Sequence, residues 1–299
     1  MEPRSAHRYP FQPIERLESE LAANLPAVDV APEILHRAMH RAIFAGGKRI
    51  RPRVLLTVAA ACGAPGSDLA IRAACAIEYV HAASLVHDDL PCFDDADERR
   101  GQPTLHRVYG EAMAVLAGDA LLARAFEVLS GAPKHARRAL KIVHLFSRAT
   151  GTTHGLIGGQ GLEESIVEPG SHDAKTRAQA LLALPPDDLD RYHAMKTVAL
   201  FRLATESGAI AGGAKDPTLW AEVGNYLGLA YKLLDDLGAT RGRAPDSEAL
   251  RAAFADKRAR LEALLDTAWT LGSAQASDPR PLRELLGPIR GYIAEADAG

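Results

Sequence analysis

Cysteine and aromatic residues are scarce in this sequence, and both shortages restrict what it can be. The three cysteines, Cys62, Cys75 and Cys92, are odd in number and show no metal-ligand spacing. They argue against a disulfide framework and a zinc centre, and they fit a reducing compartment. Aromatic residues make up 5% of the chain, although hydrophobic residues make up 47%. Ala, Leu and Val must therefore build the core, and a core rich in Ala and Leu favours helices over strands.

The sequence also lacks a strong charge excess and a long hydrophobic run. A formal net charge of -3 argues against a nucleic-acid partner, because nucleic-acid-binding domains usually have a strongly basic face. The first ten residues contain no apolar core typical of a signal peptide. The uncharged run 54–67 is interrupted by Gly63, Pro65 and Gly66 and is shorter than the ~20 apolar residues that cross a bilayer. We therefore expect a cytoplasmic protein without a membrane span.

What the sequence does contain is helical periodicity. Apolar residues recur at spacings of three and four in the segments 34–44, 54–61, 69–86, 112–129, 140–149, 189–210, 219–234 and 249–271. Gly and Pro cluster between these segments, and no strand-like alternation survives there. We predict an all-α fold, a single large helical bundle over residues 1–299. Residues 167–186 are polar and read as a surface insertion, and residues beyond Asp246 read as a solvated helical face with a covering helix.

The segment from Asp88 to Asp97 and its neighbour Glu98 hold six carboxylates directly after a long apolar helix. An acidic, solvated helix end is the plain reading, but Pro91 interrupts the acids. On an unbroken helix Asp88 and Asp94 would point about 120° apart. A loosened backbone at Pro91 would bring them together, and hard carboxylate oxygens suit Mg²⁺, which often bridges to substrate phosphates. Arg99 and Arg100 follow at once, and guanidinium groups match phosphate oxygens, so the segment predicts a diphosphate site.

Further residues fit such a site, although each also has a plainer reading. Lys48 and Arg51 lie in a glycine-led basic turn before a helix, which is either an anion site or a solvated surface turn. His81 precedes Asp88 by two helical turns on the same face, yet a lone histidine there is often a core residue. Lys196 and Thr197 enter an apolar helix, where a cation is often merely solvated. His87 is interpreted as structural.

These motifs resemble those of the trans-isoprenyl diphosphate synthase family. The resemblance rests on ordered motifs between about residues 45 and 236: Gly46-Gly47-Lys48-Arg49-Ile50-Arg51-Pro52, the DDxxxxD and RRG pattern from Asp88 to Gly101, Ala117-Gly118-Asp119, Gly158-Gly159-Gln160 and Lys196-Thr197. It implies an isoprenoid-synthase-type bundle around a central apolar cavity. It also implies a homodimer whose substrates are isopentenyl diphosphate and an allylic diphosphate.

The same resemblance assigns roles to individual residues. The diphosphate of isopentenyl diphosphate would be held by Lys48, Arg51, His81 and Arg100, and Arg99 would add a further substrate contact. Asp88, Asp94 and Asp235 would hold three Mg²⁺ ions. Lys196 would bind the allylic diphosphate, Thr197 would face the developing carbocation, and Gln160 would lie near the reacting carbons.

The second aspartate-rich motif of that family is incomplete here. Asp235 and Asp236 are present, but Ala239 replaces the third aspartate and Lys232 stands where glutamine is usual. A lost carboxylate and an added cation weaken the third metal site, although Lys232 would also be placed to contact diphosphate. Two alternatives to an active synthase follow: a catalytically impaired or regulatory homologue, and a terpene cyclase. The cyclase is disfavoured because it binds no isopentenyl diphosphate and so does not need Lys48, Arg51 and His81.

The residues before Asp88 should set the product length. We expect Ser84, Ala83, Val80 and Tyr79, which lie four, five, eight and nine residues back, to line the cavity. In the family a bulky aromatic residue five positions before the motif shortens the product. Ala83 is small, so geranylgeranyl diphosphate is favoured over farnesyl diphosphate, with Tyr79 as the floor.

Overall fold

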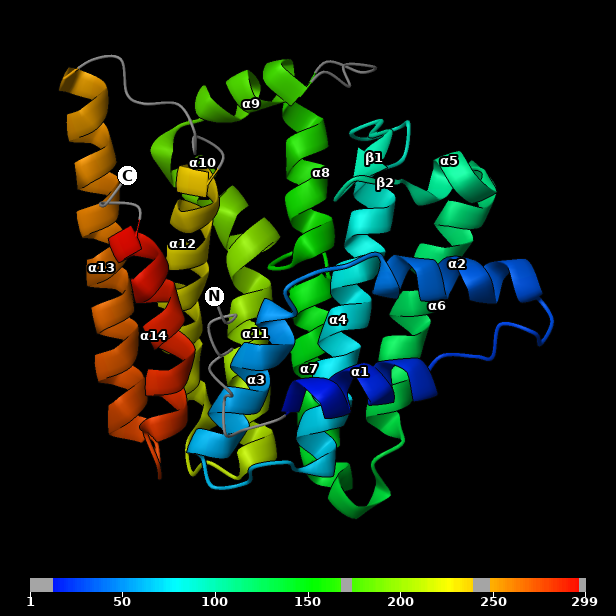
Figure 1. Cartoon of the computed structure of the whole chain (residues 1–299), viewed down its shortest axis with the longest axis horizontal. Helices are drawn as coiled ribbons and strands as arrows, with labels where there is room; N and C mark the ends of the chain where they lie inside the picture. Colours follow the sequence, from blue (N-terminus) through cyan, green and yellow to red (C-terminus); the bar gives the residue numbers. More distant parts are fainter. Residues whose placement is uncertain (1–12, 168–173, 239–247, 296–299) are drawn as a thin grey trace, which may run out of the picture.

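Helices run along most of the chain, and the long ones stand side by side (Figure 1). The structure is a computed structural model that describes residues 13–167, 174–238 and 248–295. The prediction of an all-α fold is confirmed. Several residues predicted to bind diphosphate and metal line one cavity towards the upper end of the bundle in Figure 1, where α4 (Asp68–Asp88) and α12 (Trp220–Gly238) end.

The first half of the chain contains α1 (Pro13–Ala23), α2 (Glu33–Phe44), α3 (Ile50–Ala61), α4 (Asp68–Asp88), β1 (Glu98–Arg99), β2 (Gln102–Pro103), α5 (Leu105–Tyr109), α6 (Glu111–Ser130), a 3₁₀ turn (Pro133–His135) and α7 (Ala136–Thr150). The second half contains α8 (Leu156–Ile166), α9 (Ala174–Leu182), α10 (Pro186–His193), a π-helical turn (Ala194–Val198), α11 (Ala199–Gly212), a 3₁₀ turn (Pro217–Leu219), α12 (Trp220–Gly238), α13 (Glu248–Gln275) and α14 (Arg280–Glu295).

Helix α4 is the centre of the core. It packs against α3, α6 and α11, and Ala73, Ala74 and Ala76 are completely buried, which lets the neighbouring helices approach closely. The helix is long and apolar enough to cross a membrane, but 78% of its apolar window is buried inside the bundle. Burial on all sides explains why its apolar residues do not keep to one stripe.

The short hairpin β1–β2 was not predicted. Glu98 pairs with Pro103 and Arg99 with Gln102 in an antiparallel ladder. Arg100 and Gly101 form the two-residue turn between them, and both have positive φ, at 56° and 72°. Two-residue hairpin turns of this hand favour glycine at the second position. Two paired residues on each side are too few to produce the alternation that marks a strand in a sequence.

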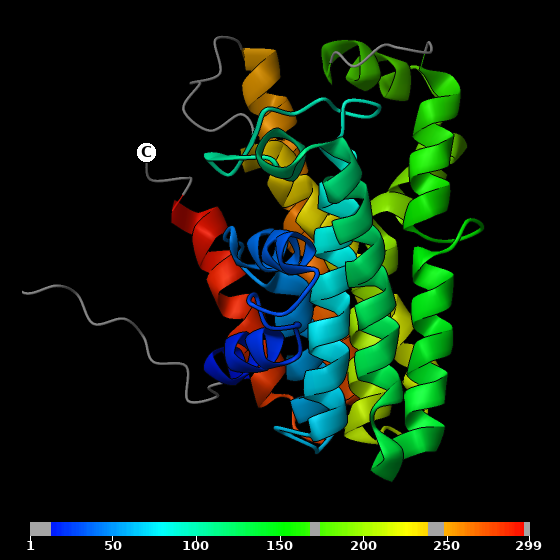
Figure 2. The same ribbon diagram turned by 90° about the vertical axis from the view of Figure 1, so that its right-hand side faces the viewer.

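The interpretation of residues 167–186 as a surface insertion did not include the helix that its second half forms. Residues Ala174–Leu182 form α9, which packs against α8 and lies across the upper end of the bundle in both views (Figures 1 and 2). Arg177 of α9 is only 4% exposed. The polar composition of this segment gives no helical periodicity, and its buried side chain, Arg177, makes ionic contacts with Asp94, Glu163 and Glu164.

Candidate functional site

The acidic segment begins where α4 ends. The helix stops at Asp88 rather than continuing with a bulge, because Pro91 has no N–H to extend it. The chain then turns back, and the backbone N–H of Asp94 donates to the carbonyl of Asp88 at 2.9 Å. A tight turn after the helix, rather than the predicted bulge within it, brings the backbones of Asp88 and Asp94 together.

Asp89 is already occupied by an arginine. Its carboxylate accepts from Arg99 Nε at 2.8 and 2.9 Å and from Nη2 at 2.6 Å, and it is 4% exposed. This bidentate pair fixes the hairpin to the end of α4. Arg99, predicted to contact substrate, is thus held by Asp89 and does not line the cavity described below.

The neighbouring carboxylates are electrostatically poised for a cation. Burial, together with the negative charge of Asp94, raises the pKa of Asp88 to about 6, although Lys196 opposes the shift. Burial also raises the pKa of Asp94, with Glu163 adding to the effect. Buried like charges raise each other's pKa because the ionised forms repel, and a bound cation removes that penalty.

The donor set fits magnesium. Among the described residues no three His, Cys, Asp or Glu side chains are grouped so that they would hold a metal ion without help. Mg²⁺ is usually bound through one or two carboxylates, waters and substrate phosphates rather than by an all-protein cage. Asp88 offers one such oxygen ligand in the wall of a cavity large enough for a diphosphate substrate. The backbone turn holds Asp94 next to Asp88, although Asp94 is not part of that wall.

A basic cluster lies beside these acids. Arg51 Nη1 donates to His81 Nε2 at 3.3 Å, and its guanidinium stacks 5.3 Å from the ring centre of Phe201 and 5.5 Å from that of Tyr231. Burial, and next the charge of Arg51, lower the pKa of His81 well below its usual range, so the ring is a neutral acceptor here. Arg51 Nε is buried without a hydrogen-bond partner, which an anionic ligand would supply.

Arg49, the middle one of the three basic residues in the glycine-led turn, points inward. Arg49 has a left-handed backbone (φ 50°) and is buried, with its side chain donating to Glu78 and Glu18 at 2.8 Å each and to the carbonyl of Ile43. It therefore anchors the turn and leaves Lys48 exposed on its surface. Sequence spacing does not separate the anchor from its neighbours.

The tip of the hairpin meets the same turn. Arg100 Nη1 donates to the carbonyl of Gly46, which places a second exposed cation beside Lys48. Lys48, Arg51, His81 and Arg100 were predicted to act together. The structure joins Arg51 directly to His81 and Arg100 to the turn that carries Lys48.

Lys196 and Thr197 lie in the π-helical turn between α10 and α11. Such turns are rare and often occur at functional sites. Lys196 Nζ donates to Gln160 Oε1 at 2.7 Å and to Glu163, which is 5% exposed. Tyr192 also donates to Glu163, at 3.0 Å. Glu163 was missed by the sequence analysis, although its position three residues after Gln160 puts both on one face of α8.

The two glycines before Gln160 allow this contact. A Cβ atom on Gly159 would lie 3.0 Å from the Lys196 backbone nitrogen, and one on Gly158 would lie 1.8 Å from the Thr152 carbonyl oxygen. Glycine at position 159 lets α8 approach the π-helical turn, and glycine at position 158 lets it lie against Thr152 in the connection before α8. The close packing at the two glycines thus brings Gln160 within hydrogen-bond distance of Lys196.

One cavity of about 620 Å³ is lined by part of these groups, and Asp94, Lys48 and Arg100 are not in its wall. Most predicted site residues line it: Arg51, His81, Ser84, Asp88, Gln160, Lys196, Thr197, Lys232 and Asp235. Its other walls are largely apolar and include Leu85, Phe93, Leu156, Ile157, Leu200 and Tyr231. His87, interpreted as structural, lines it as well. Ala239 lies outside the described residues.

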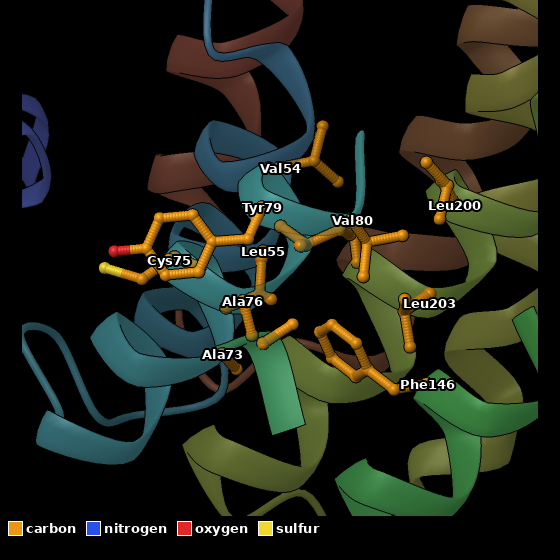
Figure 3. Packing of buried hydrophobic residues seen from close by; sticks show 14 of the residues in the cluster. Val54, Leu55, Ala73, Cys75, Ala76, Tyr79, Val80, Phe146, Leu200 and Leu203 are labelled. Atoms are coloured by element: carbon orange, nitrogen blue, oxygen red, sulfur yellow. The ribbon is translucent and has the colours of Figure 1, made fainter. Parts of the chain in front are cut away.

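The prediction that Tyr79 forms the cavity floor is wrong. Its hydroxyl donates to the Leu21 carbonyl of α1 at 2.8 Å, and Figure 3 shows its ring leaving α4 away from Leu200. At about 100° per residue, a position nine residues before Asp88 points roughly 180° away from it. Ser84, four residues before Asp88, points roughly 40° away from it, and its side chain lines the cavity.

Two further predicted wall residues are buried elsewhere. Ala83 and Val80 are completely buried and are absent from the cavity wall. They point roughly 140° and 80° away from Asp88. In Figure 3, Val80 is directed towards Leu200 and Leu203. The number of residues that separate two positions on a helix does not give the direction of their side chains, and the prediction for these residues used that number alone.

Comparison with known sequences agrees with the motifs. Residues 32–245 match the polyprenyl synthetase family. The chain is 43% identical over 227 residues to a geranylgeranyl diphosphate synthase of Cereibacter sphaeroides, covering 75% of this chain and 72% of that one. It is 42% identical over 227 residues to the enzyme of the same name from Rhodobacter capsulatus, covering 75% and 71%.

Solved structures share the whole fold. An FPP/GFPP synthase from Zymomonas mobilis superposes with a TM-score of 0.74 at 31% identity, covering 91% of this chain and 93% of that one. A geranyltransferase from Legionella pneumophila gives a TM-score of 0.78 at 25% identity, covering 94% and 95%.

Proposed function

The chain belongs to the polyprenyl synthetase family, and on this premise we propose that it is a magnesium-dependent prenyltransferase. It condenses isopentenyl diphosphate with an allylic diphosphate to give a short-chain trans-prenyl diphosphate. Geranylgeranyl diphosphate is favoured over farnesyl diphosphate, and the names of the relatives from C. sphaeroides and R. capsulatus support this product.

One observation carries the proposal. A single cavity is bounded by the carboxylate Asp88, by the basic residues Arg51 and Lys196, and by apolar side chains such as Leu200. Two anionic headgroups need cations, and a prenyl chain needs an apolar, water-excluding wall. A cyclase would need only one diphosphate site, so the Arg51–His81 pair favours condensation.

The side chains form two groups, one for each diphosphate. Arg51, His81, Lys48 and Arg100 bind isopentenyl diphosphate on the side of the glycine-led basic turn. Lys196 binds the allylic diphosphate, and Asp88 and Asp94 would hold Mg²⁺ beside it. The bound metal supplies positive charge that stabilises the departing diphosphate.

The chemical steps follow from this division. The allylic carbon–oxygen bond breaks, its electrons leave with the diphosphate, and an allylic carbocation remains. The double bond of isopentenyl diphosphate attacks that cation, and the new cation loses a proton to the departed diphosphate. Thr197 and Gln160 present oxygens near the reacting carbons, and apolar residues such as Phe93 keep out the water that would quench the cation.

We place the third magnesium ion at Asp235, which lines the cavity from α12. Lys232 lines the same wall and adds a positive charge that partly replaces metal charge at the diphosphate. Nothing observed favours the impaired or regulatory alternative, and the Asp88–Asp94 turn and basic cluster support turnover.

We further propose a cytoplasmic homodimer. Val108 of α5 and Val115 and Leu116 of α6 are exposed by 44%, 40% and 51%. Apolar side chains gathered on adjoining helices are typical of a protein interface. The cysteines in the described chain are free, which supports a reducing compartment.

Ser84 gives the sharpest test of product length. Ser84→Phe should fill the cavity four residues below Asp88 and shift the product from 20 to 15 carbons, because an aromatic ring occupies the volume of a growing chain. Chain length is read by chromatography of the dephosphorylated prenols. Ser84→Ala is the matched control and should leave the product unchanged; an unchanged product in Ser84→Phe would contradict this wall.

The activity itself is tested by pairing substrates. Purified protein is incubated with Mg²⁺, isopentenyl diphosphate and each of the 5-, 10- and 15-carbon allylic diphosphates. Consumption of isopentenyl diphosphate with formation of a longer prenyl diphosphate is expected. Cyclic hydrocarbon release without isopentenyl diphosphate would favour a cyclase, and no product from any pair would refute the proposed function.

A further inference from the structure

Arg177 brings a positive charge to the predicted metal site from α9. Its side chain is 4% exposed, and its Nε lies 3.6 Å from Asp94 Oδ1 and 3.5 Å from Glu163 Oε1. Its two terminal nitrogens both donate to Glu164, Nη1 at 3.4 Å. One guanidinium therefore faces three carboxylates, and one of these is a proposed magnesium ligand.

The same contacts connect Arg177 to the allylic side of the site. Glu164 accepts from Gln160 Nε2 at 2.9 Å, and Gln160 in turn accepts from Lys196 at 2.7 Å. Lys196 also donates to Glu163, which closes a ring of contacts back to Arg177. The ring ties α8, α9 and the π-helical turn together through charged groups.

A metal ion and Arg177 are alternative partners of Asp94. A guanidinium within about 4 Å of a carboxylate lowers the free energy of the ionised form, as a bound cation does. When a divalent ion arrives, it and Arg177 are like charges on the same side chain and repel each other. The stronger the hold of Arg177 on Asp94, the weaker metal binding must be.

We propose that Arg177 is a built-in counter-cation that occupies Asp94 in the metal-free protein and sets the affinity of the aspartate site for divalent cations. It is a positioning residue that acts through Asp94. The inference rests on the proposed function, because it takes Asp94 as a metal ligand. It also gives α9 a role: its release from Asp94 accompanies metal binding.

The test measures metal binding without turnover. Mn²⁺ is titrated into substrate-free protein and free Mn²⁺ is followed by electron paramagnetic resonance. Arg177→Gln should bind Mn²⁺ roughly tenfold more tightly than wild type, and Arg177→Lys, which keeps the charge, should stay close to wild type. Arg191→Gln, a change at an exposed arginine of the neighbouring α10, is the control and should match wild type.

Thermal unfolding supplies a second readout. In chelator, Arg177→Gln should melt at a lower temperature than wild type, because Asp94 and Glu164 lose a positive partner and Glu163 keeps Lys196. Added Mn²⁺ should narrow the difference in melting temperature. Unchanged or weaker Mn²⁺ binding in a folded Arg177→Gln protein would overturn the role of Arg177. A wild-type protein that binds no Mn²⁺ and forms no product would instead refute the proposed metal site and function.

Discussion

Asp88→Ala is expected to reduce turnover about a thousandfold or more. Asp88 lies at the end of α4, lines the cavity and has a pKa raised to about 6 by burial. Removing it would delete a proposed metal ligand at the point where we propose that the allylic diphosphate leaves. Loss of metal stabilisation is worth several kcal/mol of barrier, and each 1.36 kcal/mol is a factor of ten. Initial rates of isopentenyl diphosphate incorporation measure this effect.

Asp97→Ala provides the matched control for that variant. Asp97 belongs to the same acidic segment, but its side chain is 78% exposed and pairs with Arg107 on the surface. An exposed pair contributes little to stability, so this variant should keep near-normal activity. Near-normal activity in Asp88→Ala would refute the metal assignment, and equal loss in both variants would point to a folding defect.

Arg49→Met is expected to destabilise the fold by about 3–5 kcal/mol, because it leaves the carboxylate of Glu78 buried without its partner. Arg49 and Glu78 are 6% and 7% exposed and 2.8 Å apart. The same change releases the basic turn that carries Lys48 and Arg51. We therefore expect a higher KM for isopentenyl diphosphate in whatever fraction folds. Denaturant unfolding measures the stability term.

A double variant separates the buried charge from the lost packing. Arg49→Met with Glu78→Gln removes the unpaired charge and should be more stable than Arg49→Met alone. Arg53→Met is a useful comparison, because Arg53 donates only to the carbonyl of Lys48 among the contacts described and is half-buried. It should change stability far less. Wild-type stability of Arg49→Met would contradict the anchoring role.

The sequence predicted the helices well because their information is local. Apolar spacing and Gly or Pro breaks depend on neighbours along the chain, and α3, α4, α6, α7 and α11 follow the predicted segments. Helix α9 was missed for the opposite reason. Its stabilising partners, such as Glu164 for Arg177, are on another helix, and its apolar content gives no period.

The candidate site was predicted in part for similar reasons. The two-turn spacing predicted that Asp88 and His81 share one face of the helix. Both line one cavity with Arg51, which only the family resemblance had joined to them. Errors arose where the direction of a side chain, not its position, decides the role. Tyr79 turns away from the cavity. Arg49 points into the core while Lys48 stays exposed, a difference that sequence spacing does not predict. Glu163 was overlooked because only the fold brings it to Lys196.

We propose that one cavity holds an allylic and an isopentenyl diphosphate together, between metal-binding carboxylates and basic side chains. The most direct measurement is mass spectrometry of the product formed from farnesyl diphosphate and isopentenyl diphosphate with Mg²⁺. Geranylgeranyl diphosphate is the expected main product, and no product should form when Mg²⁺ is chelated. Unchanged substrates, or release of a cyclic hydrocarbon from farnesyl diphosphate alone, would contradict it.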